Sequence, residues 1–176
     1  MTSTKIRLRL LQNADEERLF KYFAHLSAET KSRFGPHPLD RDSVKRICND
    51  QNSGTTRYIV LDEKDDLIAY MLVKKGMNEG EKFRLQQNHI VFDEAHFCTF
   101  APSVADAWQS NGLGSAMFEA IERDISTNTP FRFIILWGGV QATNEKAVRY
   151  YEKYAFKRMG SFWYDGKANY DMIKSL

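Results

Sequence analysis

The stretch QSNGLG, residues 109–114, joins two segments with different patterns and so constrains the fold around it. Residues 95–104 (AHFCTFAPSV) precede it and predict a strand. Residues 113–126 follow and predict a helix, because one stripe carries its apolar residues: Leu113, Met117, Ala120, Ile121 and Ile125. Two glycines one residue apart at the start of a helix indicate a bound anion, since glycine lets a ligand approach the backbone closely.

The rest of the chain alternates strand and helix patterns, without an internal repeat, linker or low-complexity segment. Further strands are predicted over residues 6–10, 55–62, 67–75, 131–140, 156–164 and 167–176. Further helices are predicted after a cap at Asn13 or Asp15, over 40–50, and over 143–154 after a cap at Thr143 or Asn144. The 131–140 strand is almost continuously apolar and is therefore expected at the centre of a sheet. This order predicts one layered α/β domain spanning residues 1–176.

Some segments carry more specific expectations. Arg7 and Arg9 alternate with apolar neighbours, which predicts an opening strand with one solvent-facing side. Residues 51–54 (QNSG) predict a turn, and Asp165-Gly166 predicts a tight hairpin. Residues 76–93 show no sustained period and are interpreted as a long excursion, either functional or merely a surface loop.

Composition narrows the class of protein. The chain has 176 residues, of which 43% are hydrophobic and 27% charged, as in a globular domain, and its net charge is +2. The basic residues form no block, which argues against a nucleic-acid binder. No apolar run is long enough to cross a membrane, and the N-terminus lacks a signal-peptide pattern. Cys48 and Cys98 form no CxxC pair and fit a reducing cytoplasm, which is the expected location.

The glycine loop departs from two common phosphate-binding motifs. A P-loop requires Lys and then Ser or Thr after its last glycine, whereas Ser115-Ala116-Met117 follows here. A dinucleotide-binding loop requires a third glycine where Met117 stands. On the loop alone, a plain strand-to-helix turn also remains open.

Two motifs together resemble the GNAT superfamily of N-acetyltransferases. The first is VADAWQSNGLGSAM, in which Gln109, Gly112 and Gly114 fill the family's Arg/Gln-x-x-Gly-x-Gly/Ala pattern for acyl-coenzyme A. The second comprises Asn144 at a helix start and residues 151–156 (YEKYAF) at its end. The resemblance covers nearly the whole chain. It implies a GNAT-like α/β fold: a mixed, mostly antiparallel sheet of about seven strands flanked by helices, with strands four and five splayed apart.

The resemblance also implies where acetyl-CoA binds. The backbone amides of the loop and first helical turn would hold its pyrophosphate; these residues are Ser110, Asn111, Gly112, Leu113, Gly114 and Ser115. The pantetheine arm would pair with the edge formed by Pro102, Ser103 and Val104. The Val104 N–H would bind the thioester oxygen. Pro102 has no N–H to donate, which fits an interruption of the hydrogen bonds between strands four and five. An ordinary proline on an edge strand would look the same in the sequence.

The implied reaction is direct attack of an amine on the thioester of acetyl-CoA. Tyr151 matches the family's proton donor to the leaving thiolate, while a packed core tyrosine is the competing interpretation. Asn144 would contact the pantetheine amides or simply cap its helix. Gly139 stands where many relatives carry a glutamate base, so Glu94, His96 or water must be considered for that role.

Other features limit the partners. His96 and Cys98 are expected on one strand face, but no third ligand accompanies them, so no metal is expected. Ala155 replaces the glycine usual after the second motif's helix, which predicts an altered helix end. The expected acceptor is a small-molecule or protein amine of unidentified structure. No nucleic acid or membrane partner is expected, and the chain could form a homodimer. The alternative is a catalytically silent acyl-CoA-binding or interaction module of the same fold.

Overall fold

The computed structural model describes residues 6–50 and 53–176. Its strands are β1 Arg7–Leu10, β2 Thr55–Leu61, β3 Leu67–Lys75, β4 Phe97–Val104, β5 Phe133–Leu136, β6 Val140–Gln141, β7 Lys157–Tyr164 and β8 Lys167–Ser175. Its α-helices are α1 Glu16–His25, α2 Ala28–Ser32, α3 Arg41–Asn49, α4 Glu79–Gln87, α5 Leu113–Asn128 and α6 Glu145–Lys153. Short 3₁₀ turns are η1 Asn13–Asp15, η2 Glu94–His96 and η3 Asp106–Trp108. No helix of the described ranges has the length and apolar character to cross a membrane.

The strands form a mixed sheet of eight strands, which confirms the predicted class. Hydrogen-bonded neighbours follow the order β1-β2-β3-β4-β5-β8-β6, and β7 pairs with β8. β4 and β5 run parallel, whereas β1–β2, β5–β8, β6–β8 and β7–β8 are antiparallel. The β4–β5 register runs from Phe97↔Phe133 to Phe100↔Leu136, so it stops before Pro102.

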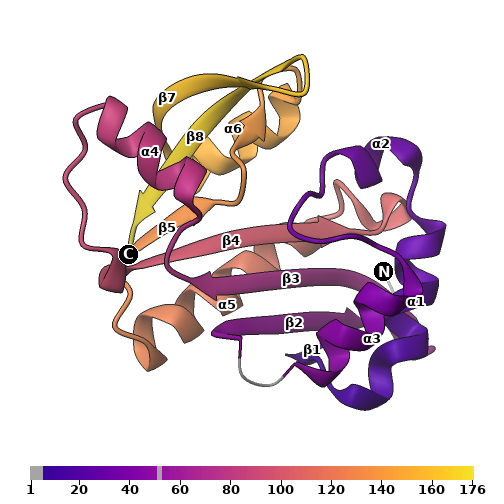
Figure 1. The fold of residues 1–176 in the computed structure, drawn as a ribbon. Helices are drawn as coiled ribbons and strands as arrows, with labels where there is room; N and C mark the ends of the chain where they lie inside the picture. The colour runs from indigo at the N-terminus through magenta and orange to yellow at the C-terminus, as the bar shows by residue number, and fades with distance from the viewer. Residues whose placement is uncertain (1–5, 51–52) are drawn as a thin grey trace. The chain divides into compact units, whose positions relative to one another are not determined.

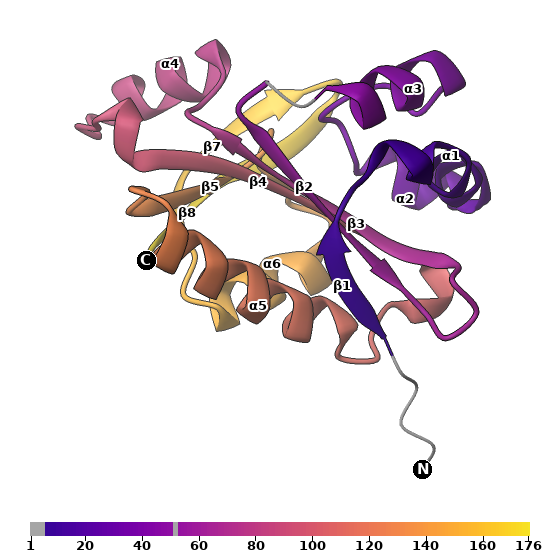
Figure 2. The ribbon, with the colours of Figure 1, turned by 90° about the horizontal axis from the view of Figure 1, so that it is seen from below.

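The chain divides into two compact units, and each is described by itself. The first unit comprises residues 1–73 and 101–121, of which the described part includes β1, β2, α1–α3 and the start of α5. In this unit α1 and α3 lie on one face of the strands and the start of α5 lies on the other (Figure 2). Its core includes buried Phe23, whose ring packs against Phe34 and, edge-on, against Tyr70.

The second unit comprises residues 74–100 and 122–176. Here α4 and α6 lie on opposite sides of the β7–β8 hairpin (Figure 1). The core beside α4 contains Met77, Leu85, Phe97, Ile135 and Ile173. The turn between β7 and β8 uses positive φ angles at Asp165 (48°) and Gly166 (68°), as predicted for a tight hairpin.

Several sequence expectations need correction. On β1 both sides are exposed in part, because Leu10 is 54% exposed and the Arg7 side chain is 55% exposed. Arg9 is instead half-buried, because its guanidinium makes two hydrogen bonds of 2.6 and 2.7 Å to buried Asp15. Asp15 is the N-cap residue of α1, as one of the two predicted candidates. Its side chain makes no cap hydrogen bond to α1, because it serves this ion pair and accepts from the Gln12 N–H at 2.9 Å.

The excursion over residues 76–93 contains a helix, α4, that the periodicity did not show. Asn78 and Glu81 form its capping box, in which each side chain accepts a hydrogen bond from the other's backbone N–H. The predicted 131–140 strand is also shorter. Gly138 (φ 62°) and Gly139 (φ 70°) turn the backbone between β5 and β6, although β5 does lie between two neighbours as expected. Of the predicted turn at 51–54, residues 51 and 52 lie outside the described residues.

Candidate active site

The glycine loop lies in the first unit, between η3 and the first turn of α5. Ser110 and Gly112 adopt positive φ angles of 69° and 81°. A Cβ built on Gly112 would meet no atom within 4 Å, so its open side faces free space. The backbone at Gly112 is therefore open on this side, and a ligand can approach it closely.

The start of α5 supplies the donors for an anion. The first amides of an α-helix have no partner within the helix and lie at the positive end of its dipole. The first turn of α5 carries no acidic side chain that would repel an anion. The predicted residues 110–115 form one continuous segment that runs into the first turn of α5.

Gln109 and Asp106 hold the loop against α2. The Gln109 side-chain amide donates to the Val104 carbonyl oxygen at 3.1 Å and to Thr30 Oγ1 at 3.3 Å. The Asp106 carboxylate accepts from Thr30 Oγ1 at 2.6 Å and from Ser27 Oγ at 2.7 Å. The Thr30 hydroxyl and then the Ser27 N–H and hydroxyl lower the pKa of Asp106 to about 2. The side chain of Gln109 thus braces the end of β4.

The end of β4 is also fixed from α1. Ser103 is buried, and its hydroxyl lies 2.8 Å from the Tyr22 hydroxyl. Burial raises the pKa of Tyr22, so this phenol remains neutral and can share the hydrogen bond. Pro102 and Val104 are half-buried, on either side of Ser103. The three predicted pantetheine-binding residues therefore belong to a rigid strand end.

The second motif lies in the second unit. Asn144, not Thr143, is the N-cap of α6, and its Oδ1 accepts from the Ala147 N–H at 3.3 Å. The helix ends in a Schellman motif. The Phe156 N–H donates to the backbone carbonyl oxygen of Tyr151, and the Ala155 N–H donates to that of Glu152, both at 3.0 Å. Ala155 itself takes the left-handed conformation (φ 64°), so the expected change of helix end does not occur.

Tyr151 is buried between aromatic rings of the same unit. It is 9% exposed, and its ring centroid lies 5.3 Å from Phe156 and 5.3 Å from Tyr150. Burial raises its pKa, because the phenolate would lose its hydration. Its phenol is therefore protonated at neutral pH, which a proton donor requires and which a core tyrosine equally shows.

Glu94 and His96 precede β4 in η2 rather than lying on the strand. Glu94 Oε2 pairs with Lys82 Nζ at 2.8 Å, and His96 Nδ1 lies 3.0 Å from Asp93 Oδ2. Cys98 lies within β4, where burial raises the pKa of its thiol to about 12. The expectation that His96 and Cys98 share a strand face is therefore wrong. Among the residues with described positions, no cluster of three or more His, Cys, Asp or Glu side chains is suited to a metal ion.

Gly139 stands where many GNAT relatives carry a glutamate base, and its contacts explain why this residue is a glycine. A Cβ there would lie 2.6 Å from the Tyr170 carbonyl oxygen and 3.0 Å from the Phe162 ring. A carboxylate instead comes from Glu81 on α4, whose Oε1 accepts from the Gly138 N–H at 3.0 Å. The capping pattern Asn78-x-x-Glu81 could have revealed α4, but the contact with Gly138 joins residues 57 apart in sequence.

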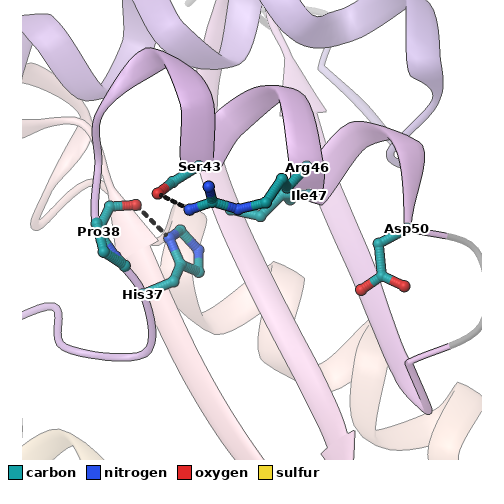
Figure 3. A pocket seen from close by; sticks show the side chains of 6 residues that line it. All are labelled: His37, Pro38, Ser43, Arg46, Ile47 and Asp50. Carbon is teal, nitrogen blue, oxygen red and sulfur yellow. Dashed lines mark hydrogen bonds between the residues drawn. The ribbon is translucent and has the colours of Figure 1, made fainter.

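A cavity of about 450 Å³ lies beside α3 in the first unit (Figure 3). It is lined by His37, Pro38, Ser43, Arg46, Ile47 and Asp50. Arg46 donates to Ser43 Oγ at 2.8 Å, and His37 Nδ1 lies 2.8 Å from the Pro38 oxygen. Its lining includes no residue of the glycine loop, so the loop geometry, rather than this cavity, defines the candidate site.

Comparisons with known proteins agree with the motifs. The model of the acetyltransferase (GNAT) family matches residues 20–156, more than half of the chain. Among curated proteins, none matches this chain. A GNAT-family acetyltransferase from Streptococcus pneumoniae has a similar structure, with a TM-score of 0.72 and 17% identity over 98% of this chain and 100% of that one.

Two further structures show the same fold. An aminoglycoside acetyltransferase solved with coenzyme A has a TM-score of 0.70 and 19% identity, over 97% of this chain and 95% of that one. A spermidine/spermine N-acetyltransferase from Vibrio cholerae, solved with manganese ions, has a TM-score of 0.68 and 18% identity, over 97% and 92%. The family match, the eight-stranded mixed sheet and the glycine loop before α5 lead to one conclusion: the chain belongs to the GNAT family of acetyltransferases.

Proposed function

We propose that this protein transfers an acetyl group from acetyl-CoA to a primary amine by direct attack. The observation that carries the proposal is the open backbone at Gly112, directly before the N-terminus of α5. The amides of residues 110–115 would bind the pyrophosphate, and the strand end at Pro102, Ser103 and Val104 would receive the pantetheine arm.

In this reaction the acceptor nitrogen loses two protons and the departing thiolate gains one. The acceptor ammonium loses one proton to a base or to water and becomes a neutral amine. Its nitrogen then forms a bond to the acetyl carbon, the carbon–sulfur bond breaks, and the thiolate of CoA leaves. The tetrahedral nitrogen loses a second proton as the amide forms, while Tyr151 protonates the thiolate and regains its proton from solvent.

Three groups can take the proton from the acceptor ammonium: Glu94, His96 and water. Glu94 and His96 remain candidates by sequence, but in the described structure each is paired with a neighbouring charged side chain. Deprotonation by water, without a dedicated side chain, is compatible with an acceptor of modest pKa. The two free cysteines, both buried, support the proposed cytoplasmic location.

A silent acyl-CoA-binding module is the second candidate, and the constraint at Gly139 favours it. This position cannot carry a base, because its Cβ would collide with the Tyr170 carbonyl oxygen. The experiment that separates the two candidates is CoA release from acetyl-CoA with a panel of amines, beginning with polyamines and aminoglycosides. Turnover with any amine supports the enzyme; tight acetyl-CoA binding without turnover supports the module.

A further inference from the structure

Glu81 contacts the backbone where the parallel strands of the second unit end. Just after the last paired residues of β4 and β5, the Trp137 N–H donates a hydrogen bond to the Phe100 carbonyl oxygen at 3.0 Å. The next residue, Gly138, donates its N–H to Glu81 Oε1 at 3.0 Å. In open α/β sheets, ligands bind outside the carboxyl ends of parallel strands. Glu81 therefore holds Gly138, which lies just beyond the carboxyl end of β5. Ligand sites form at strand ends of this kind.

Both oxygens of Glu81 are used. Oε2 accepts from the Asn78 N–H at 2.9 Å, and the residue is fully buried, at 0% exposure. Two N–H donors converge on the two oxygens, and the ionised carboxylate accepts at both without carrying a competing O–H donor. Burial raises the pKa of Glu81, an effect that the two backbone N–H groups oppose.

The charged groups around Glu81 leave it without a dedicated counter-ion. Arg84, one turn further along α4, forms two hydrogen bonds with Asp171 of β8, at 2.7 and 2.9 Å. Arg84 lowers the pKa of Glu81 while Asp171 raises it. The three side chains together carry one formal negative charge. A buried charge of this kind is costly unless its hydrogen bonds are fully made, so the bond to Gly138 matters energetically.

The two residues after Trp137 are glycines and have no side chains to fix the backbone there. Gly138 and Gly139 both adopt left-handed conformations, and Gly139 packs closely against the Tyr170 backbone. The Gly139 N–H bonds back to the Leu136 oxygen at 3.1 Å. The turn is thus clamped between β8 on one side and the Glu81 carboxylate on the other.

We propose that Glu81 is a positioning residue for acetyl transfer, because its ionised carboxylate fixes the Trp137–Gly139 turn at the carboxyl end of β5. This inference rests on the proposed function. When Glu81 takes up a proton, one of its two oxygens becomes a donor and the acceptors of the Gly138 N–H and the Asn78 N–H are no longer both available. Activity should therefore fall as the pH drops through the raised pKa of Glu81.

The test compares Glu81→Gln with Asn78→Ala. Glutamine keeps one acceptor oxygen, which can maintain the capping-box bond from the Asn78 N–H, and its amide nitrogen then faces the Gly138 N–H. Asn78→Ala removes the side chain that accepts from the Glu81 N–H at 2.8 Å and leaves the contact with Gly138 intact. Both variants should lower the melting temperature, but only Glu81→Gln should reduce kcat, by roughly 10- to 100-fold through misplacement of the turn.

The pH profile supplies the decisive readout. Wild type should show an acid limb in kcat, and Glu81→Gln should be slow with that limb absent. Equal kcat losses in the two variants, or an unchanged acid limb in Glu81→Gln, would show that Glu81 is only a helix cap and would overturn the proposal.

An NMR titration tests the contact between Glu81 and Gly138 without measuring enzyme activity. The Gly138 amide shift should titrate with the Glu81 carboxyl in the wild-type protein and should stay constant in Glu81→Gln. A Gly138 amide that does not respond in wild type refutes the proposal. An inactive wild-type chain would contradict the proposed function instead, and the Gly138 titration would still decide whether Glu81 holds the turn.

Discussion

Tyr151→Phe is the substitution that most sharply separates catalysis from packing at the second motif. The ring lies in contact with Phe156 and Tyr150, each at 5.3 Å between centroids, and phenylalanine preserves both contacts. Only the hydroxyl is lost. Burial raises the pKa of Tyr151 above the usual value for a phenol, so wild type presents a protonated donor throughout the neutral range.

The expected loss lies in the chemical step. Removing a general acid that protonates the leaving thiolate should lower kcat by roughly 10²–10⁴, which corresponds to about 3–5 kcal/mol of transition-state stabilisation. The free energy of unfolding should change by only about 1 kcal/mol, the net contribution of a typical hydrogen bond. Acetyl-CoA affinity should be nearly unchanged, because the glycine loop is untouched.

The assay is CoA release under saturating acetyl-CoA, measured with an accepted amine across a pH range. The Tyr151-dependent high-pH limb should lie above pH 10 in wild type, because burial disfavours the phenolate; an unperturbed phenol, the simpler expectation, would place it near pH 10. Tyr150→Phe is the matched control on the same helix. Small and equal effects of both substitutions would refute the assignment and leave Tyr151 as a packing residue.

Three further predictions concern stability and cofactors. Ala155→Gly should stabilise the fold by up to about 1 kcal/mol in denaturant unfolding, since glycine adopts the observed φ of 64° without the Cβ penalty; a loss of stability would contradict the strain at this position. Asp106 has a lowered pKa, so its stabilising effect is present above the ordinary carboxyl pKa of about 3.9 and is lost as the pH falls toward about 2. Melting temperatures of wild type and Asp106→Asn should therefore converge at acid pH, and a constant difference would argue against the carboxylate. Activity should persist in excess EDTA, because the described residues offer no metal-ligand cluster; a loss that added metal reverses would contradict direct transfer.

The features that the sequence predicted correctly are those set by short-range patterns. The stripe on α5, the Asn144 cap of α6 and the Asp165-Gly166 turn each depend on neighbours within a few residues. The family motifs are also local, which is why the resemblance to the GNAT superfamily could be stated without a structure.

The features that the sequence did not predict depend on distant partners or unusual burial. α4 buries only Glu81 and Leu85, so it lacks the apolar stripe that reveals a surface helix. β1 was expected to expose its arginines, but the bidentate pair with buried Asp15 draws Arg9 inward. The identity of Gly139 is dictated by the Tyr170 backbone, a contact between strands that no local pattern encodes.

The most direct test of the central claim is calorimetric titration of acetyl-CoA into Gly112→Ala and Gly166→Ala. Both glycines have positive φ, 81° and 68°, and at both a Cβ would meet open space, so the two substitutions carry similar backbone strain. At Gly112 the added methyl would occupy the space that the pyrophosphate must enter, which should cost one charge-assisted hydrogen bond or more. This is about 1.5–3 kcal/mol, or roughly a 10- to 100-fold increase in Kd. The account predicts that weakening for Gly112→Ala and unchanged binding for Gly166→Ala; equal affinity in both variants would contradict the assignment of the glycine loop as the coenzyme site.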